Sequence, residues 1–108
     1  MGMLDKDLMI ELDEDGFLID PQRWTEAVAR RLAERDGIGE LTEDHWKIIR
    51  TLRDHYLRTG AMPPEQHICH ENHLDRHCVE RLFGNSLREA WRVAGLPNPG
   101  EEAKAYMI

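Results

Sequence analysis

Cysteine is scarce in this chain of 108 residues, with Cys69 and Cys78 the two present. A chain of this length predicts one domain, which can bury a core without disulfide bonds or a structural metal. The two cysteines lie nine positions apart, a spacing that would allow a small disulfide. We expect reduced thiols instead, because few cysteines and no recognisable secretory leader are typical of proteins of the reducing cytoplasm.

Long apolar runs are missing as well. The chain does not open on a charged segment followed by an apolar stretch, and it has no run of about 20 apolar residues. The sequence therefore predicts neither a signal peptide nor a membrane span. We expect a cytoplasmic protein that has no membrane partner.

A basic stripe is the third feature that the sequence lacks. The net charge is −7, and seven acids against one lysine lie in residues 1–20, so the remaining chain is nearly neutral. A protein that binds duplex DNA needs lysine and arginine side chains to neutralise phosphates. The charge pattern disfavours nucleic acid as the main partner, although a local basic patch remains compatible with it.

The beginning of the chain predicts a β-hairpin over residues 8–19. Short apolar segments at 8–12 and 17–19 flank the sequence DEDG, whose residue types favour a tight turn. Two strands alone are marginally stable in water, so we expect the hairpin to pack on helices.

Residues 20–95 predict about five short helices. Asp20-Pro21 and Thr42 are typical helix starts, and Gly60 and Gly95 are typical helix ends. Between these signals, apolar residues recur at helical spacing. The inward-facing residues are Trp24, Val28 and Leu32; Trp46, Ile49, Leu52 and Tyr56; Ile68; Leu74, Cys78, Val79, Leu82 and Phe83; and Leu87, Trp91 and Ala94.

The expected fold class is mainly α with a small N-terminal β-hairpin. The third and fourth helices, joined by a tight turn at Asn72, look like a helix-turn-helix pair. Pro97 and Pro99 keep the residues after the last helix out of helical conformation. Residues 96–108 are therefore expected to form an extended C-terminal arm.

Histidines gather in residues 67–78, HICHENHLDRHC, which hold four of the six in the chain. We expect His73 and His77 to lie four residues apart on one face of the fourth helix, with His70 on the helix before it. These three are candidate ligands for zinc, which binds imidazole nitrogen tetrahedrally. The stretch has no C-x-x-C spacing, so the favoured interpretation is a solvated polar surface, with no metal and no cofactor.

Four segments carry a family resemblance. DEDGFLIDPQRW, LTEDHWKIIRTLRDHYLRTGAMPP, LFG and AWRVAGLPNPG occur in this order within residues 8–100. They resemble the DsrC/TusE family of sulfur-relay proteins, which includes the gamma subunit of dissimilatory sulfite reductase and relatives in tRNA thiolation. The resemblance implies one domain over 1–108, with the hairpin at 8–19, the helical bundle at 20–95 and the arm at 96–108. It also implies protein partners of sulfur metabolism, such as sulfite reductase or other sulfur-relay proteins.

The chemistry that the resemblance implies depends on cysteines near the C-terminus. In the family, a cysteine at the penultimate position accepts sulfur as a persulfide, and the sulfite-reductase type has a second cysteine upstream. Here Trp91 stands at the upstream position. The terminal position falls on Glu102 without a gap, or on Met107 when counted from the end. None of the three can form a persulfide, because none has a thiol.

These replacements predict a non-catalytic or regulatory family member, and not an enzyme, that docks on protein partners through its arm. One alternative is a sulfurtransferase in which Cys69, near His67 and His70 at a helix start, is a relocated carrier thiol. A second alternative is a helix-turn-helix regulator that binds DNA. The expected partner-binding residues are Gly95, Leu96, Pro97, Pro99, Gly100, Tyr106, Met107 and Ile108.

Overall fold

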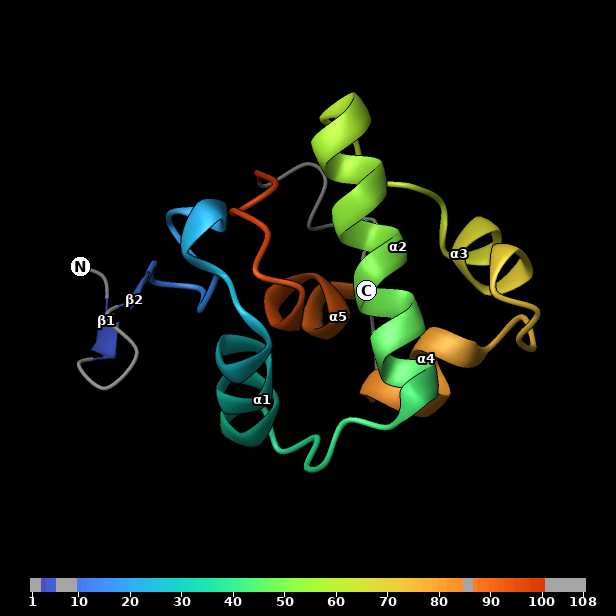
Figure 1. Cartoon of the computed structure of the whole chain (residues 1–108), viewed down its shortest axis with the longest axis horizontal. Helices are drawn as coiled ribbons and strands as arrows, with labels where there is room; N and C mark the ends of the chain where they lie inside the picture. The colour runs from blue at the N-terminus through green and yellow to red at the C-terminus, as the bar shows by residue number, and fades with distance from the viewer. Residues whose placement is uncertain (1–2, 6–9, 85–86, 101–108) are drawn as a thin grey trace.

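The computed structural model describes residues 3–5, 10–84 and 87–100, and within these ranges the chain is mainly helical with one small sheet (Figure 1). This arrangement confirms the predicted fold class. The elements in chain order are β1 (Met3–Asp5), β2 (Ile10–Leu12), the 3-10 helix η1 (Pro21–Arg23), α1 (Glu26–Arg35), α2 (Glu43–Thr59), α3 (Glu65–Glu71), α4 (Cys78–Phe83) and α5 (Leu87–Val93).

The hairpin uses segments different from those predicted. β1 and β2 pair antiparallel, with Met3 opposite Leu12, whereas the segment after the turn contributes a single bridge, from Leu12 to Leu18. The side chain of Asp13 accepts hydrogen bonds from the backbone N–H groups of Asp15 and Phe17, both at 2.9 Å. This closes a compact turn instead of extending a ladder, so the second expected strand, 17–19, does not form.

The first helix starts later than predicted. Asp20 caps only η1, through a hydrogen bond of 3.0 Å from the backbone N–H of Gln22. The backbone is then extended at Trp24, and α1 begins after Thr25, whose hydroxyl accepts from the backbone N–H of Val28. Trp24, expected on the inward face of a helix, therefore lies in the connection before it.

α2 follows its sequence signals closely. Thr42 and His45 form a capping box at its start, and Gly60 ends it in the left-handed conformation, with φ 73°. The other ring nitrogen of His45 lies 2.7 Å from the carbonyl oxygen of Leu82, so the histidine also ties α2 to α4. None of the helices in the described ranges is both long and apolar enough to cross a membrane.

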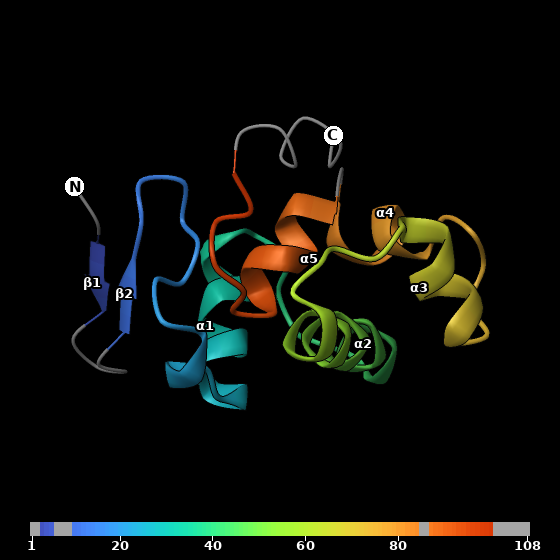
Figure 2. The ribbon, with the colours of Figure 1, turned by 90° about the horizontal axis from the view of Figure 1, so that it is seen from above.

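The core lies around α5, which packs against α1, α2 and α4. The hairpin and α1 lie toward one end of the molecule and α3 toward the other, with α2 and α5 between them (Figure 1, Figure 2). Trp91 of α5 is the largest fully buried side chain in the described ranges. Its neighbours in the core include Ile48, Ile49 and Leu52 of α2.

The predicted helix-turn-helix is not supported. Residues 72–77, a longer connection than a tight turn, separate α3 from α4, and His73 there has a left-handed backbone with φ 58°. α4 begins at Cys78, so His73 and His77 do not share one helix face. The guanidinium of Arg81 on α4 is paired with the carboxylate of Asp75 at 2.7 Å, which offsets its charge. The DNA-binding alternative therefore loses its structural basis.

Candidate functional site

The arm base, residues 94–100, leaves α5 at a glycine that no other residue could replace without strain. Gly95 has φ 69°, and its N–H bonds to the carbonyl of Arg92 while the next N–H, of Leu96, bonds to that of Trp91. A Cβ at Gly95 would lie 2.6 Å from Cγ of Trp24, inside van der Waals contact. The turn therefore directs the chain against Trp24, and Leu96 enters the core fully buried.

Trp24 and Arg53 hold the start of the arm base from the other side. The indole N–H of Trp24 donates to the carbonyl of Val93 at 3.0 Å. The guanidinium of Arg53 lies 4.2 Å from the centre of the Trp24 ring and donates to the carbonyls of Ala94, at 2.8 Å, and Pro21, at 3.2 Å. Burial lowers the pKa of Arg53. A guanidinium still keeps its proton at neutral pH, so these bonds are charge-assisted.

Trp91 fastens the arm base back onto α5. Its indole N–H donates to the carbonyl of Pro97 at 2.7 Å, and its ring meets that of Tyr56 edge-on, with centroids 5.6 Å apart. Trp91 is thus a core anchor, as the helical spacing indicated. It has no group that can bond to sulfur, and instead it sets the direction of the chain after Leu96.

Asn98 ties the arm base to the turn after β2. Its side-chain N–H₂ group donates to the carboxylates of Asp13, at 2.9 Å, and Asp15, at 3.0 Å, and its oxygen accepts from the N–H of Gly100. The arm base runs between this turn and α5 (Figure 2). Five predicted arm residues, Gly95 to Gly100 apart from Asn98, therefore lie together, while Glu102 and the predicted tip residues Tyr106, Met107 and Ile108 lie outside the described residues.

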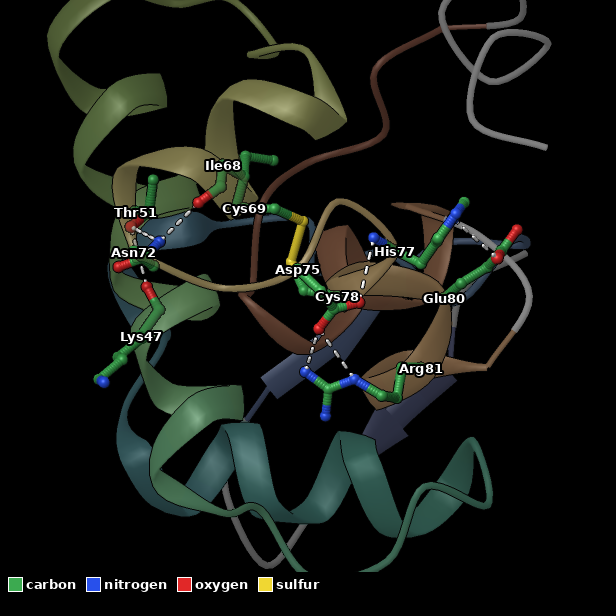
Figure 3. The surroundings of a disulfide bond; sticks show 10 residues. All are labelled: Lys47, Thr51, Ile68, Cys69, Asn72, Asp75, His77, Cys78, Glu80 and Arg81. Atoms are coloured by element: carbon green, nitrogen blue, oxygen red, sulfur yellow. Dashed lines mark hydrogen bonds and ion pairs between the residues drawn. A yellow bond between two sulfur atoms is a disulfide. The ribbon is translucent and has the colours of Figure 1, made fainter.

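The two cysteines form a disulfide, which corrects the expectation of reduced thiols. Their Sγ atoms are bonded, their Cα atoms lie 5.8 Å apart, and neither residue is exposed (Figure 3). The connection of residues 72–77 folds back so that the end of α3 meets the start of α4 within disulfide range. Cys78 is buried as predicted. The candidate carrier Cys69 is placed in the core with its sulfur already bonded, and not at the surface as a thiolate.

The histidines do not converge. His67 pairs with Glu71 at 3.2 Å, and His77 lies 3.7 Å from Glu80 and accepts from Arg76 at 3.4 Å. In the part of the chain that the structure describes, no group of three or more His, Cys, Asp or Glu side chains is arranged to hold a metal ion. The predicted set of His70, His73 and His77 is thus not brought together as a ligand group.

A polar cavity of about 520 Å³ opens beside this region. Burial raises the pKa of Glu65, and the carboxylate of Glu80 raises it further, against a smaller opposing effect of His77. Two like charges thus face one cavity. The cavity is lined by Pro64, Glu65, Gln66, Arg76, His77 and Glu80.

Sequence reasoning missed three residues that position the arm base, namely Trp24 as a hydrogen-bond donor, Arg53 and Asn98. The sequence did give a signal for Arg53: it is a cation on the predicted second helix, directly after the inward residue Leu52 and three positions before the inward residue Tyr56. The signal for Asn98 was weaker, because it is only a side-chain amide placed between Pro97 and Pro99. Neither signal identifies the groups that accept hydrogen bonds from the side chain, because each of these acceptors lies more than 30 positions away in the sequence.

Comparisons with known proteins agree with this arrangement. A model of the family described as DsrC like protein matches residues 5–101. Sulfurtransferase TusE of Pectobacterium atrosepticum is 33% identical over 98 residues, covering 83% of this chain and 89% of the relative. TusE of Escherichia coli K12 is 32% identical with the same coverage.

Solved structures point the same way. The oxidized gamma-subunit of dissimilatory sulfite reductase (DsrC) from Archaeoglobus fulgidus is 37% identical and superposes with a TM-score of 0.78, over 94% of this chain and 98% of that one. DsrC of Pyrobaculum aerophilum is 33% identical with a TM-score of 0.76, over 94% of this chain and 93% of that one. These matches confirm the resemblance seen in the sequence, and the chain belongs to the DsrC/TusE family of sulfur-relay proteins.

Proposed function

We propose that this chain is a non-catalytic member of its family, which docks on proteins of sulfur metabolism without carrying sulfur on an arm thiol. One observation carries the proposal: both cysteines of the sequence are joined in a buried disulfide between α3 and α4. Sulfur transfer needs a thiolate that can reach a partner. Trp91, Glu102 and Met107, at the family's cysteine positions, cannot supply one.

Docking is supported by the retained arm base. Gly95, the Trp91–Pro97 hydrogen bond and the Asn98 contacts hold the chain in one direction as it leaves the bundle. An arm with a fixed origin loses less conformational freedom on binding than a free tail does. Leu96 is buried and anchors the arm, which leaves Pro99, Gly100 and the residues after them to meet a partner.

The partners that we propose are proteins that the cysteine-bearing relatives use. The relatives are named as sulfurtransferases and as a subunit of dissimilatory sulfite reductase, so enzymes of these two classes are the first to test. Tyr106, Met107 and Ile108 would present an apolar tip to such a partner. We also propose a cytoplasmic location, which cell fractionation would check.

A mass measurement tests the absence of a sulfur carrier. The protein is exposed to a persulfide donor, both oxidised and after reduction, and its intact mass is recorded before and after desalting. We expect no retained sulfur in either form. The matched control is Met107→Cys, which restores a thiol next to the end of the chain and is expected to retain one sulfur atom. One sulfur retained by the unaltered protein, mapped to Cys69, would replace our proposal with sulfur transfer by a relocated carrier.

A binding measurement tests the docking role. The full chain and a chain that ends at Gly100 are compared for binding to a purified sulfite reductase and a purified relay sulfurtransferase from the same cells. We expect the full chain to bind one of them and the shortened chain to bind at least about tenfold more weakly, because the tip contacts are lost. Equal binding by both chains, or binding by neither, would contradict docking through the arm.

A further inference from the structure

The α3–α4 unit, residues 65–83, has little local support of its own. α3 has seven residues and α4 six, and neither has a capping hydrogen bond from the side chain of its N-cap residue. Helices of this length do not persist in water by themselves. The unit therefore stays ordered through its contacts with α2 and α5 and through the covalent bond between Cys69 and Cys78.

The connection inside this unit, residues 72–77, is mostly exposed, and side-chain hydrogen bonds hold it through Asn72 at its start and Asp75 near its end. The side-chain amide of Asn72 donates to the hydroxyl of Thr51 on α2 and to the carbonyl of Ile68, each at 2.8 Å (Figure 3). His73 adopts a left-handed backbone, which is unfavourable for a residue with a Cβ. The bonds of Asp75 are exposed to solvent, where such bonds contribute little stability, so the connection is a suitable place for a local opening motion.

The disulfide spans this connection from end to end. Cys69 belongs to α3, and Cys78 is the first residue of α4. The two walls of the polar cavity belong to the same two halves, with Glu65 at the start of α3 on one wall and His77 and Glu80 on the other. The bond therefore fixes not only the connection but also the shape of a surface cavity of about 520 Å³.

We propose that the Cys69–Cys78 disulfide is a redox-sensitive lock on the α3–α4 unit. A thiolate of a dithiol reductant attacks one sulfur, the S–S bond breaks, and a mixed disulfide forms with the other cysteine released as a thiol. The second thiol of the reductant then displaces the protein sulfur. The protein gains two electrons and two protons and ends with two thiols, while the reductant ends as a disulfide.

Burial determines how this reaction starts. Both cysteines are fully buried, so the reductant reaches a sulfur only when the connection opens. Once reduced, the two halves of the unit stay joined through residues 72–77 and their packing but lose the covalent cross-link, and the cavity loses its fixed shape. In a reducing compartment a protein disulfide is usually transient and redox-sensing, which is the behaviour described here. The inference concerns a surface other than the arm but involves the same disulfide that supports the proposed function; sulfur retained by the reduced protein would contradict the proposed function and not the lock.

The effect of reduction is expected to stay local. α5 packs on α1 and α2 without either cysteine, and the arm base is held by Trp24, Arg53 and Trp91. These contacts survive when the bond between α3 and α4 is broken. Reduction therefore changes one surface of a folded protein and does not unfold it.

Amide hydrogen exchange, measured by mass spectrometry on the full chain with and without dithiothreitol, tests the lock. We expect exchange in residues 65–83 to rise at least about tenfold on reduction, with less than about a twofold change in 43–56 and 87–94. Reoxidation should restore the original rates. Unchanged exchange rates in residues 65–83 would show that the disulfide does not restrain the α3–α4 unit and would contradict the proposal. Faster exchange throughout the chain would show that the disulfide stabilises the whole fold, which would also contradict it.

The rate of reduction gives a second, independent measurement that does not require a cysteine variant to fold. Asn72→Ala removes the two side-chain hydrogen bonds that tie the start of the connection to Thr51 and Ile68, so we expect dithiothreitol to reduce this variant at least about fivefold faster. Arg58→Ala, which removes an exposed ion pair on α2, is the control and should leave the rate unchanged. A disulfide that resists dithiothreitol in all three proteins would be a permanent cross-link and would overturn the proposal.

Discussion

At the residue scale, Trp91 has two structural roles, one for its ring and one for its indole N–H. Trp91 fills the centre of the core with its ring and uses its indole N–H to hold the carbonyl of Pro97. A cysteine there would be too small to fill this space and would have no donor of comparable reach. Trp91 thus anchors the arm base to α5.

The contribution of the Trp91 hydrogen bond to stability can be measured with a conservative substitution. Trp91→Phe keeps an aromatic ring and removes the N–H, so the Pro97 carbonyl loses its donor. We expect the free energy of unfolding, from urea titration, to fall by about 1–3 kcal/mol, the cost of a lost partner plus imperfect filling. Trp46→Phe, at a half-buried tryptophan that packs on the rim of the core, is the control and should cost less. An equal loss in both variants would argue against a special role for the bond.

A substitution at Gly95 tests in a similar way how the arm base leaves α5. Gly95→Ala adds a Cβ that overlaps Trp24 and also requires a left-handed backbone for alanine. We expect a loss of at least about 2 kcal/mol in unfolding free energy, because strain and steric overlap add. Gly37→Ala is matched in conformation, with φ 75°, but has nothing within 4 Å of the new Cβ. It should lose only about 1 kcal/mol, and losses that do not differ would contradict the close contact with Trp24.

At the scale of elements, the start of α4 depends on a carboxylate. Asp75 accepts from the N–H of His77, at 3.2 Å, and from the guanidinium of Arg81, at 2.7 Å. These interactions organise the last residues of the connection before the short helix. The hydrogen bond with Arg81 is the main reason that the pKa of Asp75 lies below its usual value of 3.8.

This shift predicts a pH dependence with a definite sign. A carboxylate whose pKa is lower in the folded state stabilises that state above the unfolded pKa. The contribution is therefore present above about pH 4 and is lost as the pH falls through the folded value. We expect Asp75→Asn to be less stable than the unaltered protein at pH 6 and to approach it at pH 3, in urea titrations at both values. A difference that grows toward low pH would reverse the assigned sign.

At the scale of the whole molecule, Arg53 joins three parts of the chain. From α2 it reaches the carbonyl of Pro21 in η1 and that of Ala94 after α5, while its guanidinium covers the ring of Trp24. A side chain that bridges elements far apart in the sequence stabilises their tertiary arrangement, and not a single helix. This set of Arg53 contacts, called the Arg53 clamp, also fixes the position at which the arm base begins.

Replacing Arg53 tests this clamp. Arg53→Met keeps much of the apolar stem and removes every donor, so the carbonyl of Ala94 loses its partner while that of Pro21 keeps the backbone N–H of Trp24. We expect the unfolding free energy to fall by about 1–3 kcal/mol, mostly from the unpaired Ala94 carbonyl and the lost ring contact. Arg50→Met, on the same helix but exposed, should change it by less than about 0.5 kcal/mol. A small effect at Arg53 would mean that water readily replaces the guanidinium.

The sequence by itself determined those features that depend on neighbouring residues. Helical spacing placed Trp91 and Cys78 in the core, Thr42 and Gly60 marked the ends of α2, and four segments identified the family. These signals are local, because a helix is specified by residues three and four apart and by its caps.

The tertiary structure decided what depends on residues far apart. The strand that pairs with β2 was assigned wrongly, and His73 and His77 were placed on a helix that starts only at Cys78. The disulfide was judged absent because spacing alone cannot say that residues 72–77 bring two sulfur atoms together. Likewise, the partners of Arg53 and Asn98 are set by how helices and turns pack, and packing is a property of the folded chain and not of any segment.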